Sequence, residues 1–362
     1  MKENRKILIL VTQGIVGGTS TFLLELTQSL IDAGEDITLA YGSGEYIKER
    51  STELNLKNIH LKWMGRTVNP LKGLMSFLEV RAVLKREKYS VIHLNSSNAL
   101  IAGIAAKTII RGPRVVFTVH GLSFLDKNAD VSNLLKWAYG LGMRFLLLFV
   151  DRIVFVSNEN YTRAKQKGIV KNGHVIRNGL KDPTFLSREE ARKELSLGNG
   201  FIIGSIGRLV SQKNYEFLIS QAENFPNAEV IIIGEGKERG KLEKLIKGNV
   251  SLLGEIQNAS RYLKAFDVFV LPSRYEGFSI SLLEALFAGI PVLVSDVGGA
   301  QEILSDTNQI FPFNNAEAFN SKCRRIIESE DYRESLGLSN YESSRKFSIE
   351  KAAEEYIKVY RT

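Results

Sequence analysis

The segment spanning residues 268–302 constrains the fold more than any other part of the sequence. It opens with a short apolar run, Val268–Leu271, which is typical of a strand buried in a parallel sheet. After a polar loop, apolar residues recur at a helical spacing from Ile280 until Gly289 ends the helix. A second buried run, Pro291–Ser295, follows at once. The segment therefore predicts a parallel sheet with two successive loops at the carboxyl ends of its strands, where open α/β sheets bind ligands.

The same alternation of strands and helices occurs twice along the chain. Near the start, strands are expected at Lys6–Thr12 and Ile37–Tyr41, around a helix at Ser20–Ala33, which is a βαβ opening. A polar stretch, Lys181–Asn199, interrupts the pattern before it restarts with a strand at Phe201–Ile206. A chain of 362 residues is also too long for one ordinary core. We therefore expect two Rossmann-like α/β domains.

The hinge between these domains is expected at His174–Gly179, so that residues 1–178 form the first domain and residues 179–348 the second. Asn95–Asn98 has the composition of an N-cap cluster for a helix that begins at Ala99. Further strands are expected at the other apolar runs of the two domains: Val91–Leu94, Arg114–Val119, Val150–Val156, Glu229–Ile233 and Val250–Leu253.

The composition excludes several classes of protein. A single cysteine, Cys323, rules out an intrachain disulfide and favours a reducing compartment. The apolar run Ile7–Val11 is too short for a signal peptide. Charges interrupt the most apolar region, Phe145–Val156, whereas a membrane span needs about 20 apolar residues. We therefore expect a cytoplasmic protein without a membrane span.

Charge is distributed unevenly along the chain. Residues 1–178 contain 25 Lys and Arg against 14 Asp and Glu, a net charge of +11, whereas the remainder carries −3. A basic half suits nucleic acid, anionic lipid or an acidic ligand. No recognised nucleic-acid-binding motif accompanies this charge, so nucleic acid is not expected as a partner.

The segment Pro70–Tyr89 allows two interpretations. It can form a helix that packs in the first domain with a solvated basic face. Alternatively, the basic face rests on an anionic membrane surface, where about 1 kcal/mol per basic residue suffices for reversible docking. The segment carries an apolar set and a basic set, with Lys62 and Arg66 just upstream: Leu71, Leu74, Met75, Leu78, Val80 and Val83, and Lys72, Arg81, Lys85, Arg86 and Lys88.

Two acidic residues lie at the predicted helix of the 268–302 segment. Glu276 precedes this helix and Glu284 lies in its early turns. The free N–H groups and the dipole of a helix N-terminus attract anionic ligand atoms, so the backbone of residues 277–279 can bind a sugar or a diphosphate. Glu284 can accept hydrogen bonds from two neighbouring hydroxyls, as on a ribose. Alternatively, Ser281-x-x-Glu284 is a capping box worth about 1 kcal/mol to the helix.

Basic residues and a histidine follow other predicted strands. Arg208 and Lys213, after the strand at 201–206, can neutralise a diphosphate, although two charges in a turn are commonly a solvated loop. His120 follows the strand at 114–119, where substrate would lie, although a lone histidine is more often structural. The glycine-rich loop after the first strand does not satisfy G-x-G-x-x-G, so a dinucleotide fingerprint is not supported.

Several motifs carry a family resemblance. They are Glu276-Gly-Phe-Ser-Ile-Ser-Leu-Leu-Glu284, Gly207-Arg208-Leu-Val-Ser-Gln-Lys213-Asn214, and the continuation through Ala288-Gly-Ile-Pro-Val-Leu and Gly298-Gly-Ala-Gln-Glu302. The first resembles the E-x7-E signature of the retaining glycosyltransferases of family 4, and the second resembles their G-R-x-x-x-x-K-[GN] motif. The resemblance implies the GT-B fold, two Rossmann-like domains facing across a cleft. It also implies that the C-terminal helix, about residues 349–362, folds back onto the first domain.

The resemblance implies a role for each candidate residue. Glu276 would contact the donor sugar, His120 would reach that sugar from the first domain, and Glu284 would bind the nucleotide ribose. The first domain would bind the acceptor and the second the donor. The donor-binding groups near the diphosphate and the base would be Gly17, Gly18, Arg208, Lys213, Ile256, Gly277, Phe278 and Ser279.

The implied function is transfer of a hexose-type sugar, with retention, from a nucleotide-diphospho sugar to a glycan or lipid-linked acceptor in bacterial surface polysaccharide synthesis. The donor is expected to be a UDP-sugar rather than a GDP-sugar. No D-x-D motif ends a strand, so neither a metal nor another cofactor is expected. The protein would act in the cytoplasm, or peripherally at the inner face of the membrane. A nucleotide-sugar epimerase or a phosphorylase on the same fold, and a non-catalytic nucleotide-sugar-binding subunit, are the alternatives.

Overall fold

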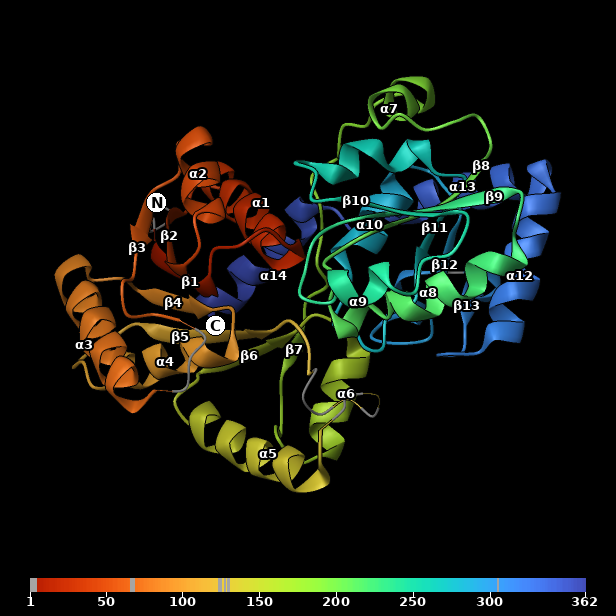
Figure 1. The fold of residues 1–362 in the computed structure, drawn as a ribbon. Helices are drawn as coiled ribbons and strands as arrows, with labels where there is room; N and C mark the ends of the chain where they lie inside the picture. The colour runs from red at the N-terminus through yellow and green to blue at the C-terminus, as the bar shows by residue number, and fades with distance from the viewer. Residues whose placement is uncertain (1–4, 66–68, 123–125, 127, 129–130, 305) are drawn as a thin grey trace. The chain divides into compact units, whose positions relative to one another are not determined.

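The computed structural model describes residues 5–65, 69–122, 126, 128, 131–304 and 306–362. The chain divides into two compact units, Met1–Gly179 together with Ile349–Thr362, and Leu180–Ser348. Each unit contains one parallel β-sheet covered by helices (Figure 1). The predicted α/β class with two Rossmann-like domains is therefore confirmed. Arg66, which belongs to the membrane prediction, lies outside the described residues.

The sheet of the first unit has seven parallel strands in the order β3-β2-β1-β4-β5-β6-β7. The interior strand β1 pairs on both sides, with Ile7 opposite Ile37 of β2 and opposite Val91 of β4. A strand covered on both faces is apolar at every position, which explains the unbroken buried run Ile7–Val11. The strands are β1 Lys6–Gln13, β2 Asp36–Ser43, β3 Asn58–His60, β4 Val91–Leu94, β5 Arg114–Val119, β6 Arg152–Phe155 and β7 His174–Val175.

Helices α3, α4 and α5 of the first unit contribute to one hydrophobic core over the sheet. This core contains Leu84 of α3, Ala105 of α4 and Met143 of α5, together with β-strand residues such as Leu8 and Phe117. The helices of this unit are α1 Gly18–Asp32, α2 Tyr46–Glu53, α3 Pro70–Glu87, α4 Leu100–Lys107, α5 Asn133–Leu147, α6 Asn158–Gln166 and α14 Ile349–Arg361. Among the described residues, no helix combines the length and apolar character needed to cross a membrane.

The last helix, α14, returns to the first unit and is held there by a buried polar network. The Tyr360 hydroxyl lies 2.8 Å from Nδ1 of His93 in β4. The other ring nitrogen of His93 lies 2.7 Å from Thr118 Oγ1, which lies 3.0 Å from the Tyr356 hydroxyl. Because all four side chains are buried, each polar atom depends on its partner in this chain of hydrogen bonds. The network joins α14 to two strands of the sheet.

The sheet of the second unit has six parallel strands in the order β10-β9-β8-β11-β12-β13. Strands β8 and β11 are neighbours, with Val268 opposite Ile203, although two strands separate them in the sequence. The direction of winding therefore reverses between β8 and β11, and open α/β sheets bind ligands at such a switch point. The strands are β8 Phe201–Ile206, β9 Ala228–Ile233, β10 Val250–Gly254, β11 Val268–Leu271, β12 Val292–Ser295 and β13 Ile310–Phe311.

The helices of the second unit include the one predicted after β11. α10 spans Ile280–Phe287, and its buried residues lie at the apolar positions that predict it. The other α-helices are α7 Arg188–Glu194, α8 Tyr215–Gln221, α9 Arg239–Glu243, α11 Ala300–Ile303, α12 Ala316–Glu328 and α13 Glu330–Ser344.

One prediction about local structure is wrong. Asn95–Asn98 does not cap a helix, since neither the 3-10 turn Ser97–Ala99 nor α4 has a side-chain cap. Asn98 instead donates to the Gly65 carbonyl. The side-chain nitrogen of Asn95 donates to the His93 carbonyl, and its side-chain oxygen lies 2.9 Å from His120 Nε2. Because these side chains bond to other parts of the fold, they do not cap a helix, although the sequence has the composition of a cap.

Candidate functional site

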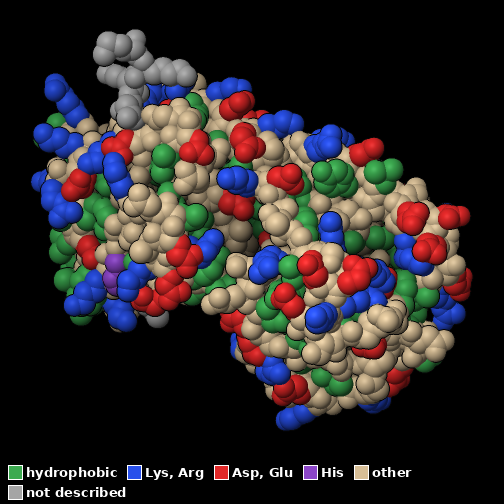
Figure 2. Space-filling model, turned by 90° about the horizontal axis from the view of Figure 1, so that it is seen from above, with side chains coloured by type: hydrophobic (Ala, Val, Ile, Leu, Met, Phe, Trp, Pro, Cys, Tyr) green, Lys and Arg blue, Asp and Glu red, His purple; other side chains and the backbone are tan. Residues whose placement is uncertain are grey.

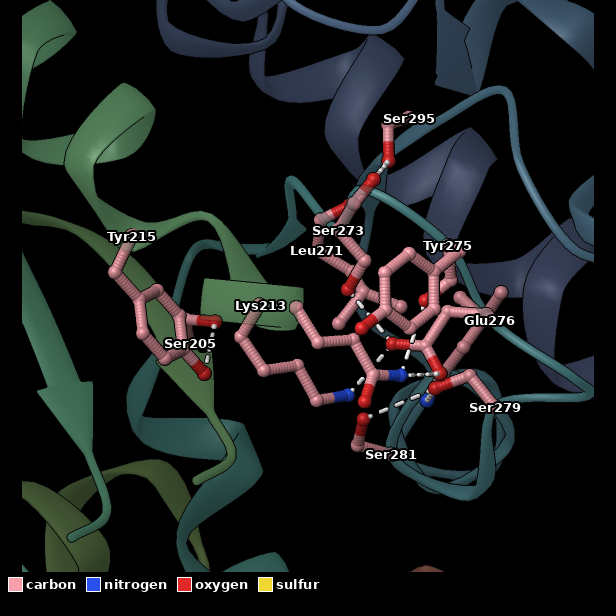
Figure 3. Close-up of polar contacts among 12 residues, drawn as sticks. Ser205, Lys213, Tyr215, Leu271, Ser273, Tyr275, Glu276, Ser279, Ser281 and Ser295 are labelled. Atoms are coloured by element: carbon pink, nitrogen blue, oxygen red, sulfur yellow. Dashed lines mark hydrogen bonds and ion pairs between the residues drawn. The ribbon is translucent and has the colours of Figure 1, made fainter. Parts of the chain in front are cut away.

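The candidate site of the second unit is built from the loops that follow β8 and β11, on either side of the switch point. Lys213 ends a 3-10 turn, Ser211–Lys213, in the first loop, and Glu276 lies in the second. Lys213 Nζ is 2.7 Å from Glu276 Oε1, and the two side chains are only 13% and 11% exposed (Figure 3). The structure thus brings together two predicted site residues that are more than sixty positions apart.

Further polar contacts fix the Glu276 carboxylate. The Ser273 hydroxyl donates to Glu276 Oε1 at 2.7 Å, and the Ser295 hydroxyl of β12 donates to the Ser273 carbonyl at 2.6 Å. Gln212 Nε2 donates to the Tyr275 carbonyl at 3.0 Å and lies 3.5 Å from Glu276 Oε2. Figure 3 shows Lys213 and Ser273 directed at the Glu276 carboxylate, with Ser295 behind Ser273. Groups from three different segments therefore determine where its oxygens lie.

The loop after β8 is itself held against the loop after β11. Asn214 adopts the left-handed conformation with φ of 55°, which Asn tolerates better than most residues. Its side-chain amide donates to the Pro272 carbonyl at 3.0 Å and to Asn314 Oδ1 at 2.8 Å. Tyr215 follows at the start of α8, where burial raises the pKa of its phenol well above the usual value. This anchoring keeps Lys213 directed at Glu276.

The loop after β12 approaches the backbone of Glu276. Gly298 has φ of 54°, and a Cβ at this position would collide with the Glu276 carbonyl. Glycine adopts this positive φ and allows this close backbone approach without strain, because it has no Cβ. A small pocket lies beside Glu276 and is lined in part by Ser279, Ser295 and Gly298. Most of the lining is apolar, from Leu271, Leu282, Val294, Val297, Ala300 and Ile303, so the polar groups of Glu276, Ser279 and Ser295 lie at the border of a largely apolar pocket.

Helix α10 begins at this pocket, and its capping differs from one of the two interpretations of the sequence. Its N-cap is Ser279, whose hydroxyl accepts the Leu282 N–H at 3.4 Å. Glu284 therefore lies in the second turn, beyond the N3 position that a capping box requires, and Ser281-x-x-Glu284 is not a capping box. The Phe278 ring packs on Phe347, with ring centroids 5.5 Å apart, so its side chain belongs to the core.

Arg208 lies in the loop after β8, the loop of Lys213, and Ile256 lies in the loop after β10 at the same edge of this sheet. Arg208 follows β8 and is exposed, and its guanidinium makes no hydrogen bond to another described residue. Ile256 follows β10 and is half-buried. The structure does not join either side chain to the Lys213–Glu276 pair, so their participation in the site stays a prediction.

His120 belongs to the first unit, at the carboxyl end of β5. Its Nε2 is 2.9 Å from Oδ1 of Asn95, which follows the neighbouring strand β4. The Asn95 amide nitrogen donates to the His93 carbonyl at 3.2 Å, which fixes the orientation of the amide. His120 Nε2 must therefore carry the proton, and Nδ1 is the acceptor. Burial lowers the pKa of His120 to about 4, so the ring is neutral near pH 7.

Gly17 and Gly18 lie at the carboxyl end of β1 in the first unit. Gly17 is the N-cap residue of α1, whose first residue is Gly18, and the Gly17 carbonyl accepts the Thr21 N–H at 3.1 Å. The two glycines therefore lie where the loop after β1 enters α1, beside the switch point between β1 and β4.

Sequence reasoning missed Ser273, Gln212 and Asn95. Ser273 stands three residues before Glu276, and that spacing was available as a signal because a serine can reach a glutamate across one turn. Gln212 and Asn95 act through contacts with segments distant in the sequence, which no local pattern reveals. Within the described part of the chain, no group of three or more His, Cys, Asp or Glu side chains is arranged to hold a metal ion.

Two family models match the chain, one in each half. Residues 16–182 match "Glycosyltransferase Family 4", and residues 187–343 match "Glycosyl transferases group 1". Among curated proteins, the chain is 31% identical over 252 residues to the UDP-Gal:alpha-D-GlcNAc-diphosphoundecaprenol alpha-1,3-galactosyltransferase of Escherichia coli. The aligned part covers 65% of each chain. It is 26% identical over 361 residues to the O-antigen biosynthesis glycosyltransferase WbnH of Escherichia coli, covering 97% of each.

The fold is also similar to that of solved structures. HepE of Anabaena, determined in complex with UDP and glucose, superimposes with a TM-score of 0.83 at 19% identity. The alignment covers 99% of this chain and 100% of HepE. At this identity the likeness concerns the fold alone, which is the GT-B fold predicted from the sequence motifs.

Proposed function

The chain belongs to the glycosyltransferases, and we propose that it is a retaining enzyme that moves a hexose-type sugar from a nucleotide-diphospho sugar to a glycan or lipid-linked acceptor. The Lys213–Glu276 pair at the switch point of the second sheet is the observation that carries this proposal. The process is the synthesis of a bacterial surface polysaccharide, since the relatives include a galactosyltransferase acting on a diphosphoundecaprenol-linked sugar and an O-antigen biosynthesis enzyme. The protein would work at the cytoplasmic side of the membrane.

The second unit is proposed as the donor domain. Lys213 and the exposed Arg208 follow the same strand, so both cations can approach one diphosphate. Arg offers a planar fork to phosphate oxygens and Lys a compact charge. The backbone N–H groups of Gly277, Phe278 and Ser279 precede α10, where anionic oxygens are favoured.

The two glutamates would bind different parts of the donor. Glu276 is fixed by Ser273 and Lys213, so it can present an oxygen in a constant position to sugar hydroxyls. Glu284, in the second turn of α10, would accept from the ribose hydroxyls, and main-chain groups near Ile256 would contact the base. The donor is proposed to be a UDP-sugar, because the relative named above uses UDP-Gal and HepE was solved with UDP.

The first unit is proposed as the acceptor domain. Its neutral His120 has Nδ1 as an acceptor for a sugar hydroxyl, because Nε2 donates to Asn95. Gly17 and Gly18 lie where the loop after β1 meets α1, and neither has a side chain, so acceptor and diphosphate can approach the backbone there.

The proposed chemistry is an internal return. The bond between the anomeric carbon and the diphosphate oxygen breaks, and the acceptor oxygen bonds to the same face of that carbon. The departing phosphate oxygen takes the acceptor proton, so the protein supplies no nucleophile. Lys213, Arg208 and the N-terminus of α10 would stabilise the charge on the diphosphate, and the reaction is proposed to proceed without a metal.

A donor screen followed by product analysis tests the proposal. Thermal stability is measured with UDP-glucose, UDP-galactose and their N-acetylated forms, with GDP-mannose as control, since a ligand at a hundredfold excess over its dissociation constant adds about 2.7 kcal/mol. The stabilising donor is then incubated with lipid-linked sugar acceptors, and the anomeric configuration of the product is read by NMR. An α-linked product from an α-linked donor supports retention. Sugar conversion without an acceptor would instead indicate an epimerase, and stabilisation without any product a binding subunit.

A further inference from the structure

Helix α5 of the first unit has an apolar surface on its outer side. Its inner side contributes Met143 and Leu147 to the core. On the outer side, large apolar residues recur at intervals of three and four positions, the spacing of one helical face, and each is between 44% and 76% exposed. They are Leu134, Trp137, Leu141, Phe145 and Leu148. A surface helix normally turns polar residues to water, so this outer stripe lacks the partner that its composition suits.

Helix α3 exposes an apolar stripe as well. Helix α4 packs against both α3 and α5, so the three helices form one layer on the sheet. In α3, Val80 and Leu84 face the core, whereas Leu71, Leu74 and Leu78 are between 48% and 68% exposed. Two helices of the same layer therefore expose apolar stripes.

This layer is also basic. Helix α5 contains Lys136 and Arg144 and no acidic residue, and Arg144 is exposed. The last turns of α3 add Lys85 and Arg86. Figure 2, seen from above, shows Lys and Arg side chains interspersed with Asp and Glu over the face of the molecule that it presents.

The two acids of α3 are already engaged. Glu79 accepts the backbone N–H groups of Lys62 and Trp63 at 2.9 and 3.0 Å. Glu87 pairs with Lys6 and Arg86. Arg86 is thereby engaged too, and Lys136 donates to the Asp126 carbonyl, so the positive charge available to a partner of this layer comes from the exposed Lys72, Lys85 and Arg144.

We propose that the outer stripe of α5, residues 134, 137, 141, 145 and 148, inserts into the interface of an anionic lipid bilayer, with the basic residues of α3 and α5 against the headgroups. A helix that buries one apolar face while cations flank it binds a membrane surface in the plane of the interface. An exposed tryptophan within the stripe fits that position, because its ring is amphipathic. The positive charge favours anionic lipid over an apolar protein surface.

The inference changes the earlier interpretation of residues 70–89. One of the two interpretations of that segment places its basic face on a membrane, whereas the exposed apolar residues favour insertion of α5 and leave α3 a flanking role. Arg81 is partly withdrawn from such a role, since its Nε donates to Thr108 Oγ1 at 3.0 Å. The proposal extends the proposed function, because a lipid-linked acceptor would be reached from this surface, but binding to lipid can be measured without donor or acceptor.

Vesicle co-sedimentation tests the proposal directly. Wild-type protein is mixed with phosphatidylcholine vesicles containing or lacking about one-third phosphatidylglycerol, at low and high salt. We expect binding that needs the anionic lipid and falls with salt, because the attraction is screened over about 8 Å at physiological ionic strength. The double variant Trp137→Ser, Phe145→Ser should bind at least tenfold less. The matched control Leu338→Ser removes a residue of the second unit that is 62% exposed, and should bind as wild type.

Fluorescence locates the contact and separates the alternatives. In a Trp63→Phe background, Trp137 is the remaining tryptophan, and its emission should shift to shorter wavelength with anionic vesicles only. Sedimentation velocity checks whether a second copy covers the stripe instead. A dimer that the double variant converts to monomer, with no vesicle binding, would overturn the proposal, as would equal binding by wild type and double variant. Unchanged turnover of a water-soluble acceptor by the double variant separates failure of docking from failure of the proposed function.

Discussion

The Lys213 ammonium pairs with Glu276 in this structure, and the proposed function requires it to bind the donor diphosphate as well. In this structure it bonds to Glu276 in a site that is largely withdrawn from water, where such a contact is stronger than on an open surface. An incoming diphosphate must therefore draw on a cation that already has a carboxylate partner. Arg208 differs, because it is exposed and its guanidinium has no hydrogen-bond partner among the described residues. The two cations should respond differently to removal.

Arg208→Ala and Lys213→Ala should each lower kcat/KM by about thirtyfold, equivalent to about 2 kcal/mol, since charge-assisted hydrogen bonds are the strong ones. Only Lys213→Ala should also lower the melting temperature, because it leaves the buried Glu276 carboxylate without its cation. Steady-state kinetics at subsaturating donor and thermal unfolding measure the two effects. Near-normal kcat/KM in either variant would remove that residue from the diphosphate site.

The two glutamates should fail in different ways. Glu276→Gln should mainly lower kcat, because Ser273 and Lys213 hold this carboxylate where it would align the reacting sugar. Glu284→Gln should mainly raise the KM for the donor, because ribose contacts bind ground and transition states alike. Both are read from full saturation curves. An exchange of the two effects would mean that the roles of Glu276 and Glu284 are reversed.

At the level of residues, the sequence predicts those site groups that belong to a contiguous motif. The structure brings together Glu276 and Lys213, which belong to two motifs whose spacing along the chain is informative, whereas the role of Glu284 stays a prediction. Ser273, Gln212 and Asn95 are found only in the structure, since their contacts depend on how separate loops meet.

At the level of elements, buried strands are the best predicted part of the fold. Val91–Leu94, Arg114–Val119, Phe201–Ile206 and Val268–Leu271 are strands with the predicted bounds, because strands covered on both faces must be apolar throughout. Helix ends are predicted less well, since tertiary contacts compete for capping residues, as at Asn95. The exposed apolar face of α5 could not be predicted either. Apolar residues lie on both sides of this helix, so their spacing does not indicate which side is buried.

The attachment of α14 to the sheet should depend on pH through His93. Burial lowers the pKa of His93 to about 3, below an unfolded value near 6.5. The unfolded chain therefore takes up the proton first, so this contribution to stability is present above pH 6.5 and is lost progressively between pH 6.5 and about 3. The unfolding free energy should fall by up to about 1.4 kcal/mol per pH unit from this group.

His93→Gln provides the comparison for this pH dependence. Glutamine does not titrate, so its unfolding free energy should fall less steeply than that of wild type between pH 6.5 and 4, whatever its absolute stability. Urea unfolding at half-unit pH intervals supplies both curves. Equal slopes would show that His93 does not contribute. His120, whose pKa burial lowers to about 4, should remain a source of acid sensitivity in both proteins.

At the level of the whole molecule, we propose that side chains and a helix N-terminus, and no metal ion, stabilise the negative charge of the leaving diphosphate. If Lys213, Arg208 and the N-terminus of α10 stabilise the leaving diphosphate, activity should survive EDTA with less than a twofold change in kcat. Initial rates with and without chelator, and after addition of Mn²⁺ or Mg²⁺, measure this. Complete loss on chelation, restored by Mn²⁺, would require a metal site that the proposal lacks.

The chain passes between its two units twice, and this has a consequence for biosynthesis. The two passages are neighbours, since Leu180 N–H donates to the Phe347 carbonyl at 3.0 Å and Leu180 pairs with Ser348. Tyr356 and Tyr360, buried in the first unit, lie beyond the second passage. On the ribosome, α14 emerges only after all of the second unit. All of the second unit is therefore synthesised before α14, and the first unit, although begun earlier, cannot complete its packing until α14 has been added.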